Sequence, residues 1–308
     1  PPLGLPPVPV PADNPMTEEK VELGKMLYFD KRLSKDGTLS CATCHIPEHG
    51  YAEPHEVSTG IKNQQGPINS PPVINAAYAT SMFWDGRMKT LEEQAAGPVE
   101  NPIEMGHDMA IVAKDLNTIP EYQKRFKDVF GKPADKDSIT KAIAAFERTI
   151  LAGNSPFDRM QNGEKDAIGT DAQEGWNLFQ QKLCATCHTP SLFSNYAFYN
   201  TGVGVEDGNI PDGRFAVTKS PTDKGAFRVP ILRNLANTYP YLHDGSAKTI
   251  EEAVQFMAGG GLDNPNLNPL FRAVKAQNIS EEQVKKIVAF LDTLNGEYPI
   301  VKEPKLPE

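Results

Sequence analysis

The stretch "LCATCHTP" at residues 183–190 repeats most of "SCATCHIP" at residues 40–47. The pentapeptide CATCH therefore occurs twice. Its two copies contain every cysteine of the chain, namely Cys41, Cys44, Cys184 and Cys187. Two C-x-x-C pairs fit three kinds of chemistry: a four-thiolate zinc site, a redox-active dithiol, and a porphyrin attached through two thioethers.

The residue that follows each pair separates these three alternatives. His45 and His188 come directly after the two pairs, although the chain has only six histidines. In a c-type haem site the two cysteines bind the porphyrin edge and the next histidine ligates the iron. We therefore predict two covalently bound haem c groups, one in each half of the chain. Because bacteria attach this haem outside the cytoplasmic membrane, we also expect a periplasmic protein.

The composition narrows the range of partners. The net charge is -9 and the basic residues do not cluster, which argues against nucleic acid or an anionic membrane surface and favours a basic protein partner. No apolar run approaches the roughly 20 residues of a membrane span. The opening "PPLGLPPVPVPADNP" resembles an exported protein from which the signal peptide has been removed. We expect this proline-rich arm to be extended, either loose or draped on the body.

A longer repeat surrounds the two pentapeptides. "SPPVINAAYATSMFWDGRMKTLEE" (70–93) matches "RVPILRNLANTYPYLHDGSAKTIEE" (228–252) at a spacing of 159 residues, which aligns Asn75 with Asn234. The cysteine pairs are only 143 residues apart. We therefore expect an insertion of about 16 residues in the second half, within residues 194–215.

The predicted secondary structure is helical. Capping-box motifs, in which a Ser or Thr is followed three residues later by Glu or Gln, predict helix starts at Thr90, Thr170, Thr249 and Ser280. Apolar residues at helical spacing in 142–150 and 284–294 predict buried helix faces.

These patterns predict an all-α, loop-rich fold with two cytochrome-c-like helical haem domains related by duplication. The 27 prolines and 24 glycines account for the expected loops. We place the proline-rich arm at residues 1–16, the first haem domain at 17–160 and the second haem domain at 161–308.

The two haem sites differ in the second ligand that each half offers to iron. After His188 the candidates are Met257 and His243, and we favour Met257 because His/Met ligation is the electron-transfer arrangement. At the position of Met257 in the repeat, the first half has Pro98, which cannot bind iron. The haem on His45 must therefore use another side chain or have an open face.

An open haem face becomes a site for peroxide cleavage when an acid–base group lies beside it. Cleavage of the O–O bond needs a proton to move from one oxygen to the other. Glu104, in "GPVENPIEMGHD", is the candidate for this transfer, although its sequence context fits a surface loop equally well.

Over nearly its whole length, from about Thr17 to Asn295, the sequence resembles the bacterial dihaem cytochrome c peroxidases. The matching pieces are both C-x-x-C-H motifs, "GPINSPP", "FWDGRMKTLEEQAAGP", "NPIEM", "FRVPILRN", "YLHDG" and the helix that carries Met257. The resemblance implies reduction of hydrogen peroxide to water with electrons from a small periplasmic cytochrome c or a cupredoxin. It also implies a homodimer.

The resemblance further implies a role for each matching residue. His45 is the ligand of a low-potential peroxidatic haem, and Glu104 is its acid–base group. Trp84 lies between the haems as an electron conduit, and His188 and Met257 ligate a high-potential haem where electrons enter. A calcium ion between the domains is also implied, with ligands Asn69 and the carbonyls of Thr238 and Pro240.

One position departs from the family pattern. Many members have a Gly-His step whose histidine caps the peroxidatic iron until the other haem is reduced, whereas this chain has Gly60-Ile61. His55 or His49 could substitute from the same loop, or the iron is five-coordinate at rest. We assign His55 to the distal loop of the haem site without requiring that it bind iron, and we predict that no reductive activation is needed.

Two other functions fit the same motifs. The protein could be a dihaem electron carrier without turnover, or a relative that oxidises aromatic side chains of a partner protein. Glu104 argues against the first. Met257 argues against the second, because the resemblance implies a tyrosine at this position in enzymes of that kind.

Overall fold

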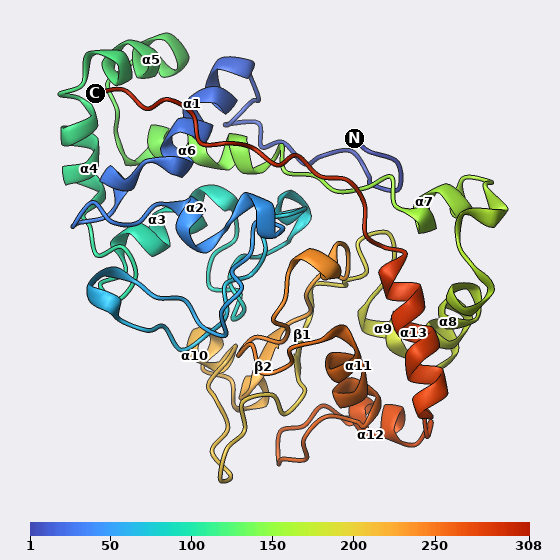
Figure 1. The fold of residues 1–308 in the computed structure, drawn as a ribbon. Helices are drawn as coiled ribbons and strands as arrows, with labels where there is room; N and C mark the ends of the chain where they lie inside the picture. Colours follow the sequence, from blue (N-terminus) through green and yellow to red (C-terminus); the bar gives the residue numbers. More distant parts are fainter.

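The computed structural model describes all of residues 1–308, and it is predominantly helical (Figure 1). The first lobe contains α1 (Glu18–Phe29), α2 (Cys41–Cys44), α3 (Leu91–Glu100), α4 (Met109–Leu116), α5 (Pro120–Phe130) and α6 (Lys136–Glu147). The second lobe contains α7 (Pro156–Gln161), α8 (Thr170–Gln181), α9 (Cys184–Cys187), α10 (Phe215–Thr218), α11 (Ile250–Ala258), α12 (Pro269–Lys275) and α13 (Glu281–Asp292). Long loops join them, as the proline and glycine content predicts.

Two short strands form the only sheet. β1 (Phe198–Asn200) pairs antiparallel with β2 (Ala226–Arg228). β1 lies inside the predicted insertion 194–215, whereas β2 follows it in the chain. In Figure 1 the sheet lies between the two lobes. The sequence patterns had indicated helices alone.

The core of the first lobe forms where α1 crosses α6. Gly24 allows this close approach, because a Cβ there would collide with the carbonyl oxygen of Ala142. Leu23 and Leu27 of α1 and Ile143 of α6 are fully or almost fully buried in the same cluster. The predicted buried face within 142–150 is thereby confirmed.

The second lobe repeats this crossing with α8 and α13. Gly175 of α8 lies where a Cβ would collide with the carbonyl oxygen of Lys286. An aromatic cluster fills the space around the crossing; its members are Phe157, Trp176, Phe179, Phe193 and Phe290. Because Phe157 belongs to α7, this helix packs with the second lobe although it precedes residue 161, the predicted start of that domain.

The loops that follow the two haem motifs also correspond. Asn75 exchanges two hydrogen bonds of 2.9 Å with the backbone of Ala152, and Asn234 does the same with Gly296 at 2.8 and 3.1 Å. Both asparagines have left-handed backbone angles, with φ of 58° and 61°. These side chains tie the loop after each haem motif to the end of its own domain.

All four predicted helix starts are confirmed to within one residue, and three of the four predicted residues act as caps. The side chains of Thr90, Thr249 and Ser280 each accept a hydrogen bond from the backbone N–H three residues later. Thr170 is instead the first residue of α8, and Gly169 occupies the cap position. The reason is that the side chain of Gln173 bonds the carbonyl of Ile168, so it does not complete a box with Thr170.

The two chain ends lie along the body. The N-terminal arm is draped, as one of the two alternatives predicted: Leu5 is buried, and the carbonyl of Pro6 accepts a hydrogen bond from Tyr78 Oη at 2.8 Å. The C-terminal segment leaves α13 and returns across the first lobe, where Leu306 packs on its core (Figure 1). No helix is both long and apolar enough to cross a bilayer.

Candidate active site

Two cavities, one in each lobe, contain the two CATCH motifs. The first is lined by Cys41, Cys44 and His45, together with residues of the loop 58–76 and of α3. The second is lined by Cys184, Cys187 and His188, together with residues of α11 and α13. Each cavity therefore has the two thiols and the imidazole that a c-type haem requires.

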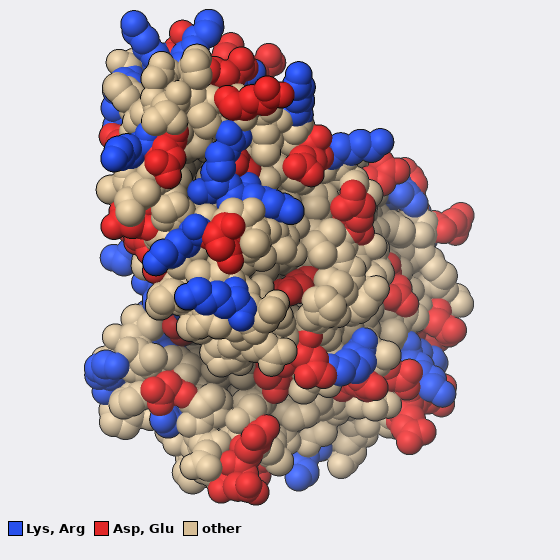
Figure 2. Space-filling model, turned by 60° about the vertical axis from the view of Figure 1, so that its left-hand side comes forward, with Lys and Arg blue, Asp and Glu red and all other residues tan.

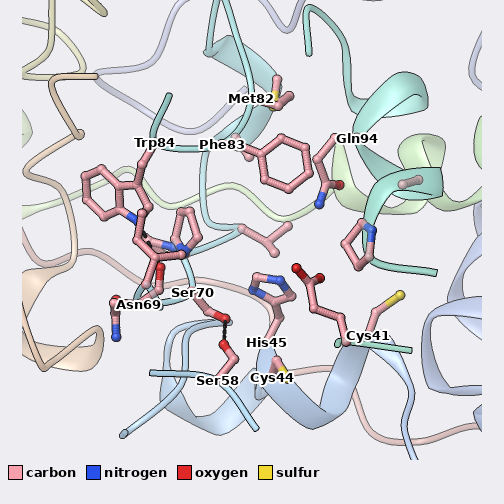
Figure 3. A pocket seen from close by; sticks show the side chains of 18 of the residues that line it. Cys41, Cys44, His45, Ser58, Asn69, Ser70, Met82, Phe83, Trp84 and Gln94 are labelled. Atoms are coloured by element: carbon pink, nitrogen blue, oxygen red, sulfur yellow. Dashed lines mark hydrogen bonds between the residues drawn. The ribbon is translucent and has the colours of Figure 1, made fainter. Parts of the chain in front are cut away.

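In the first motif, α2 is a single helical turn formed by the CATC residues. Ser40 caps this turn, and the His45 backbone N–H donates to the Cys41 carbonyl at 2.9 Å. The His45 imidazole projects into the cavity (Figure 3). Burial lowers the pKa of His45 to about 4, so the ring is neutral at pH 7 as an iron ligand must be. Its Nδ1 is buried without a hydrogen-bond partner.

The second motif has the same geometry and one additional bond. α9 is again one turn, and His188 Nδ1 lies 2.9 Å from the carbonyl oxygen of Phe193. An Nδ1–H that donates to this carbonyl leaves the Nε2 lone pair for a metal. Burial also lowers the pKa of His188 to about 4. Both histidines therefore fit the role of haem ligand.

The four cysteines do not fit the two alternative chemistries. The two pairs line different cavities, and no group of three or more metal-binding side chains occurs in the protein. A four-thiolate zinc site is thereby excluded. Burial raises the pKa of Cys44 to about 12 and that of Cys184 to about 11, opposite to the lowered pKa of redox-active dithiols. Apolar burial of the thiols fits thioether attachment.

Glu104, the predicted acid–base residue, lies in the first cavity. Glu104 lines it from the loop after α3 and is half-buried, so it is not a surface loop residue. Asn101 Nδ2 donates to Glu104 Oε1 at 2.7 Å, which leaves Oε2 for another partner. Burial raises the pKa of Glu104. Pro98 lines the same cavity, and Gln94 projects from α3 toward it (Figure 3).

His45 is the only histidine among the residues that line the first cavity. His55, predicted as part of the haem site, is exposed and lines a neighbouring polar pocket at the surface, which shares Leu39, Thr59 and Gly60 with the cavity. His49 lies 2.7 Å from the Tyr239 carbonyl through Nε2, in a contact between the lobes. The structure therefore does not bring His55 into the cavity that contains His45, and its side chain is exposed in the loop after Glu53.

A hydrogen-bonded chain connects this surface pocket with the first cavity. Glu53 lines the pocket, whereas Ser58 and Ser70 line the cavity. Ser58 Oγ donates to Glu53 Oε2 at 2.6 Å and lies 2.5 Å from Ser70 Oγ (Figure 3). Burial raises the pKa of Glu53. The three side chains form a continuous polar path from the surface into the cavity.

The second cavity offers a different set of ligands. Met257 lines it from α11, in the position that Pro98 has on α3. His243 also lines it, but its ring is stacked on Phe227 with centroids 3.6 Å apart. The hydroxyl of Tyr241, a third lining residue, donates to the Leu235 carbonyl at 2.6 Å. Of these three candidate ligands, Met257 is the one whose side chain makes neither a stacking contact nor a hydrogen bond.

A thin wall separates the two cavities. The residues that line both are Asn69, Pro72, Trp84, Arg228, Pro230 and Ile231. Trp84 is buried, and its Nε1 donates to the Asn69 carbonyl at 2.8 Å. The ring of Trp84 lies edge to face with that of His243, its counterpart in the 159-residue repeat. Trp84 is therefore the aromatic side chain of the wall.

The predicted calcium ligands also gather near this wall. Asn69, Thr238 and Pro240 all line the second cavity. The backbone N–H of Asn69 donates to the His243 carbonyl at 2.8 Å, and its Nδ2 donates to the His55 carbonyl at 2.9 Å. The side-chain carbonyl of Asn69 has no hydrogen-bond donor, so it is free for a cation.

The first cavity also contains a buried acid that no sequence pattern predicts. Glu147, the last residue of α6, is buried and lines this cavity, and its Oε2 has no hydrogen-bond partner. Burial raises the pKa of Glu147 to about 8. The neighbouring Arg148 does not neutralise it, because Arg148 forms a two-pronged ion pair with Glu92 at 2.7 and 2.9 Å.

We expect the Glu147→Gln variant to be more stable than the parent above neutral pH. The folded pKa of about 8 exceeds the ordinary value of 4.5, so the parent loses stability as pH rises through this interval, whereas Gln does not titrate. The advantage of the variant should grow by about 3 kcal/mol between pH 5 and pH 8, measured by urea unfolding. Exposed Glu100→Gln is the control, and equal pH slopes for Glu147→Gln and the parent would contradict the prediction.

Two Cys-Cys-His cavities in two helical lobes define a c-type cytochrome with two haem sites. The family model for di-haem cytochrome c peroxidase matches residues 18–166, and that for cytochrome c matches residues 172–295. Cytochrome c551 peroxidase of Nitrosomonas europaea is 42% identical over 97% of this chain and 86% of its own length. The methylamine utilization protein MauG of Methylorubrum extorquens is 39% identical over 97% and 85%. The chain belongs to the di-haem cytochrome c peroxidase family.

Solved structures support the same assignment. A crystal structure of a MauG-like protein associated with microbial copper homeostasis has a TM-score of 0.86 and 31% identity, with 97% of both chains covered. The diheme peroxidase BthA from Burkholderia thailandensis has a TM-score of 0.75 at 20% identity, over 92% of this chain and 87% of its own, which shows the shared fold alone. The two haem c groups of the family correspond to the two cavities.

Proposed function

We propose that the protein reduces hydrogen peroxide to water, with electrons from a small periplasmic cytochrome c or a cupredoxin. The balanced reaction consumes H₂O₂, two protons and two electrons and yields two waters. The observation that carries the proposal is the difference between the cavities: Glu104 and Gln94 line the one around His45, and Met257 lines the one around His188. When bound, the haems supply the iron that binds peroxide and the redox centres that pass electrons.

Glu104 and Gln94 act on the peroxide. With haem bound on His45, Glu104 Oε2 would accept a proton from one peroxide oxygen and return it to the other, so that the O–O bond could break with loss of water. Asn101 holds Oε1 and thereby orients the carboxyl group. The amide of Gln94 projects toward the cavity (Figure 3) and donates to, or accepts from, the bound substrate. Glu53, Ser58 and Ser70 deliver the protons that the reaction consumes.

The second lobe receives electrons. His188 and Met257, which both line the second cavity, would hold the haem iron there, and a thioether ligand would close that site to substrate and raise its potential. Trp84 in the shared wall lies on the route between the two cavities. Figure 2 shows acidic and basic side chains intermixed on one face of the molecule, so charge on this face does not mark a docking site for the donor.

Several finer features complete the proposal. The two lobes derive from one duplicated haem domain, supported by the matching Gly24 and Gly175 crossings and by the Asn75 and Asn234 loop ties. Residues 1–16 form an arm, and the domains divide just before α7, a few residues earlier than the predicted boundary at 160/161. A calcium ion binds at Asn69 with carbonyls of 238 and 240, and the protein acts as a periplasmic homodimer.

The test uses the dihaem protein with a reduced small cytochrome c as donor. Adding hydrogen peroxide should oxidise two equivalents of donor per peroxide. Stopped-flow mixing of the fully oxidised protein with peroxide should also change the spectrum of the His45 haem at once, because no second histidine lines that cavity. If the oxidised form does not react with peroxide, the prediction that no reductive activation is needed is contradicted. If the donor is not oxidised in any redox state, the protein is a dihaem electron carrier and not a peroxidase.

A second candidate is the other activity that the family resemblance implies, oxidation of aromatic side chains in a partner protein; the chain is also 39% identical to a methylamine utilization protein. Met257 argues against it, since Met and not Tyr faces the second cavity from α11. The spectrum of the reduced haems separates the two, because thioether and phenolate ligation give different bands.

A further inference from the structure

Three arginine side chains of the protein are buried, and two of them have carboxylate partners. Arg148 binds Glu92 through two hydrogen bonds of 2.7 and 2.9 Å. Arg233 binds Asp158 through two bonds of 2.8 Å. The third, Arg228, is 9% exposed and has no acidic side chain within ion-pair distance. Its guanidinium is therefore a buried charge that the protein itself does not neutralise.

The position of Arg228 limits what its partner can be. Arg228 is the only charged residue among the six that line both cavities. Its Nε donates to the Phe83 carbonyl at 3.3 Å, and its backbone N–H donates to the Trp84 carbonyl at 2.8 Å. These bonds fix the stem of the side chain to the wall. The terminal nitrogens Nη1 and Nη2 have no protein hydrogen-bond partner.

A second unpartnered donor lies beside this guanidinium. The Arg228 guanidinium lies 5.8 Å from the centroid of the Tyr196 ring, and Tyr196 also lines the first cavity. The hydroxyl of Tyr196 is buried without a hydrogen-bond partner. A buried cation and a buried hydroxyl that both lack acceptors cost free energy unless an anion binds there.

We infer that Arg228 and Tyr196 form a binding site for haem propionates, and that Arg228 is shared by the haems of both cavities. Propionates are the only anionic groups on the haem periphery, and a guanidinium binds carboxylates through two parallel hydrogen bonds. Because the same residue holds the backbone of Phe83 and Trp84, it also links the two cofactors to the aromatic residue between them. The inference rests on the two haems and not on peroxide turnover.

The test measures the two haem midpoint potentials and the resonance Raman propionate-bending bands of the dihaem protein. In Arg228→Gln, loss of a positive charge that favours the ferrous state should lower the reduction equilibrium constant of each haem about tenfold. The propionate bands of both haems should shift. Arg228→Lys should retain most of the potential, and Arg214→Gln, which changes a half-buried arginine outside both cavities, should change neither.

The outcomes separate clearly. Unchanged potentials and bands in Arg228→Gln, with both haems still bound, would overturn the inference. A change at one haem alone would overturn the shared contact. If Arg228→Gln fails to fold, Tyr196→Phe serves in its place, and it should shift the propionate bands of the His45 haem alone. Peroxidase activity enters none of these measurements, so failure of the proposed function stays distinguishable.

Discussion

The Glu104→Gln variant is expected to turn over hydrogen peroxide ~10²–10⁴-fold more slowly than the parent protein, with both haem spectra unchanged. The amide has nearly the same shape and can still accept the hydrogen bond from Asn101, so the cavity keeps its geometry. It cannot take up and return a proton at Oε2. The expected loss is therefore in kcat, measured by donor oxidation at saturating peroxide.

A matched control lies four residues earlier. Glu100, at the end of α3, is exposed and forms an ion pair with Lys136 at 2.7 Å. Glu100→Gln removes the same charge close to the cavity, and it should leave kcat within about twofold, because exposed ion pairs contribute little. Turnover of Glu104→Gln equal to that of the control would remove Glu104 from the mechanism.

The sequence predicted the parts of the site that depend on local chemistry. The CATCH pentapeptide determines a single helical turn that places two thiols and one imidazole on the same cavity, and both α2 and α9 have this form. The 159-residue repeat likewise predicted that Pro98 and Met257 occupy equivalent positions, each lining its own cavity. Such features follow from short-range geometry and from spacing.

Features that depend on tertiary contacts were missed or mistaken. The sequence does not distinguish Glu147 or Arg228 from the many charged residues at the surface. What sets these two apart is that each is buried and has side-chain atoms without a hydrogen-bond partner, and both properties depend on the tertiary structure. His55 lies close to the haem motif in sequence, yet the loop turns it to solvent. Thr170 has the sequence of a cap, but the backbone begins its helix one residue too early for that role.

The Met257→Leu variant tests the proposed ligand of the second haem. Leucine preserves the apolar volume of the side chain on α11 and removes the sulfur. Since axial ligands set haem potentials over about 0.8 V and a thioether raises them, the variant should lower the reduction equilibrium constant of this haem by ~10²-fold or more. Electron entry from the donor should slow accordingly, while the haem on His45 keeps its own potential.

A second methionine of the same lobe supplies the control. Met160 packs against the aromatic core but lines neither cavity, so Met160→Leu should leave both potentials unchanged. Spectroelectrochemical titration of each haem measures the effect directly. An unchanged potential in Met257→Leu would transfer the ligand role to His243, the other lining side chain with an unpartnered donor atom, and His243→Phe should then produce the loss instead.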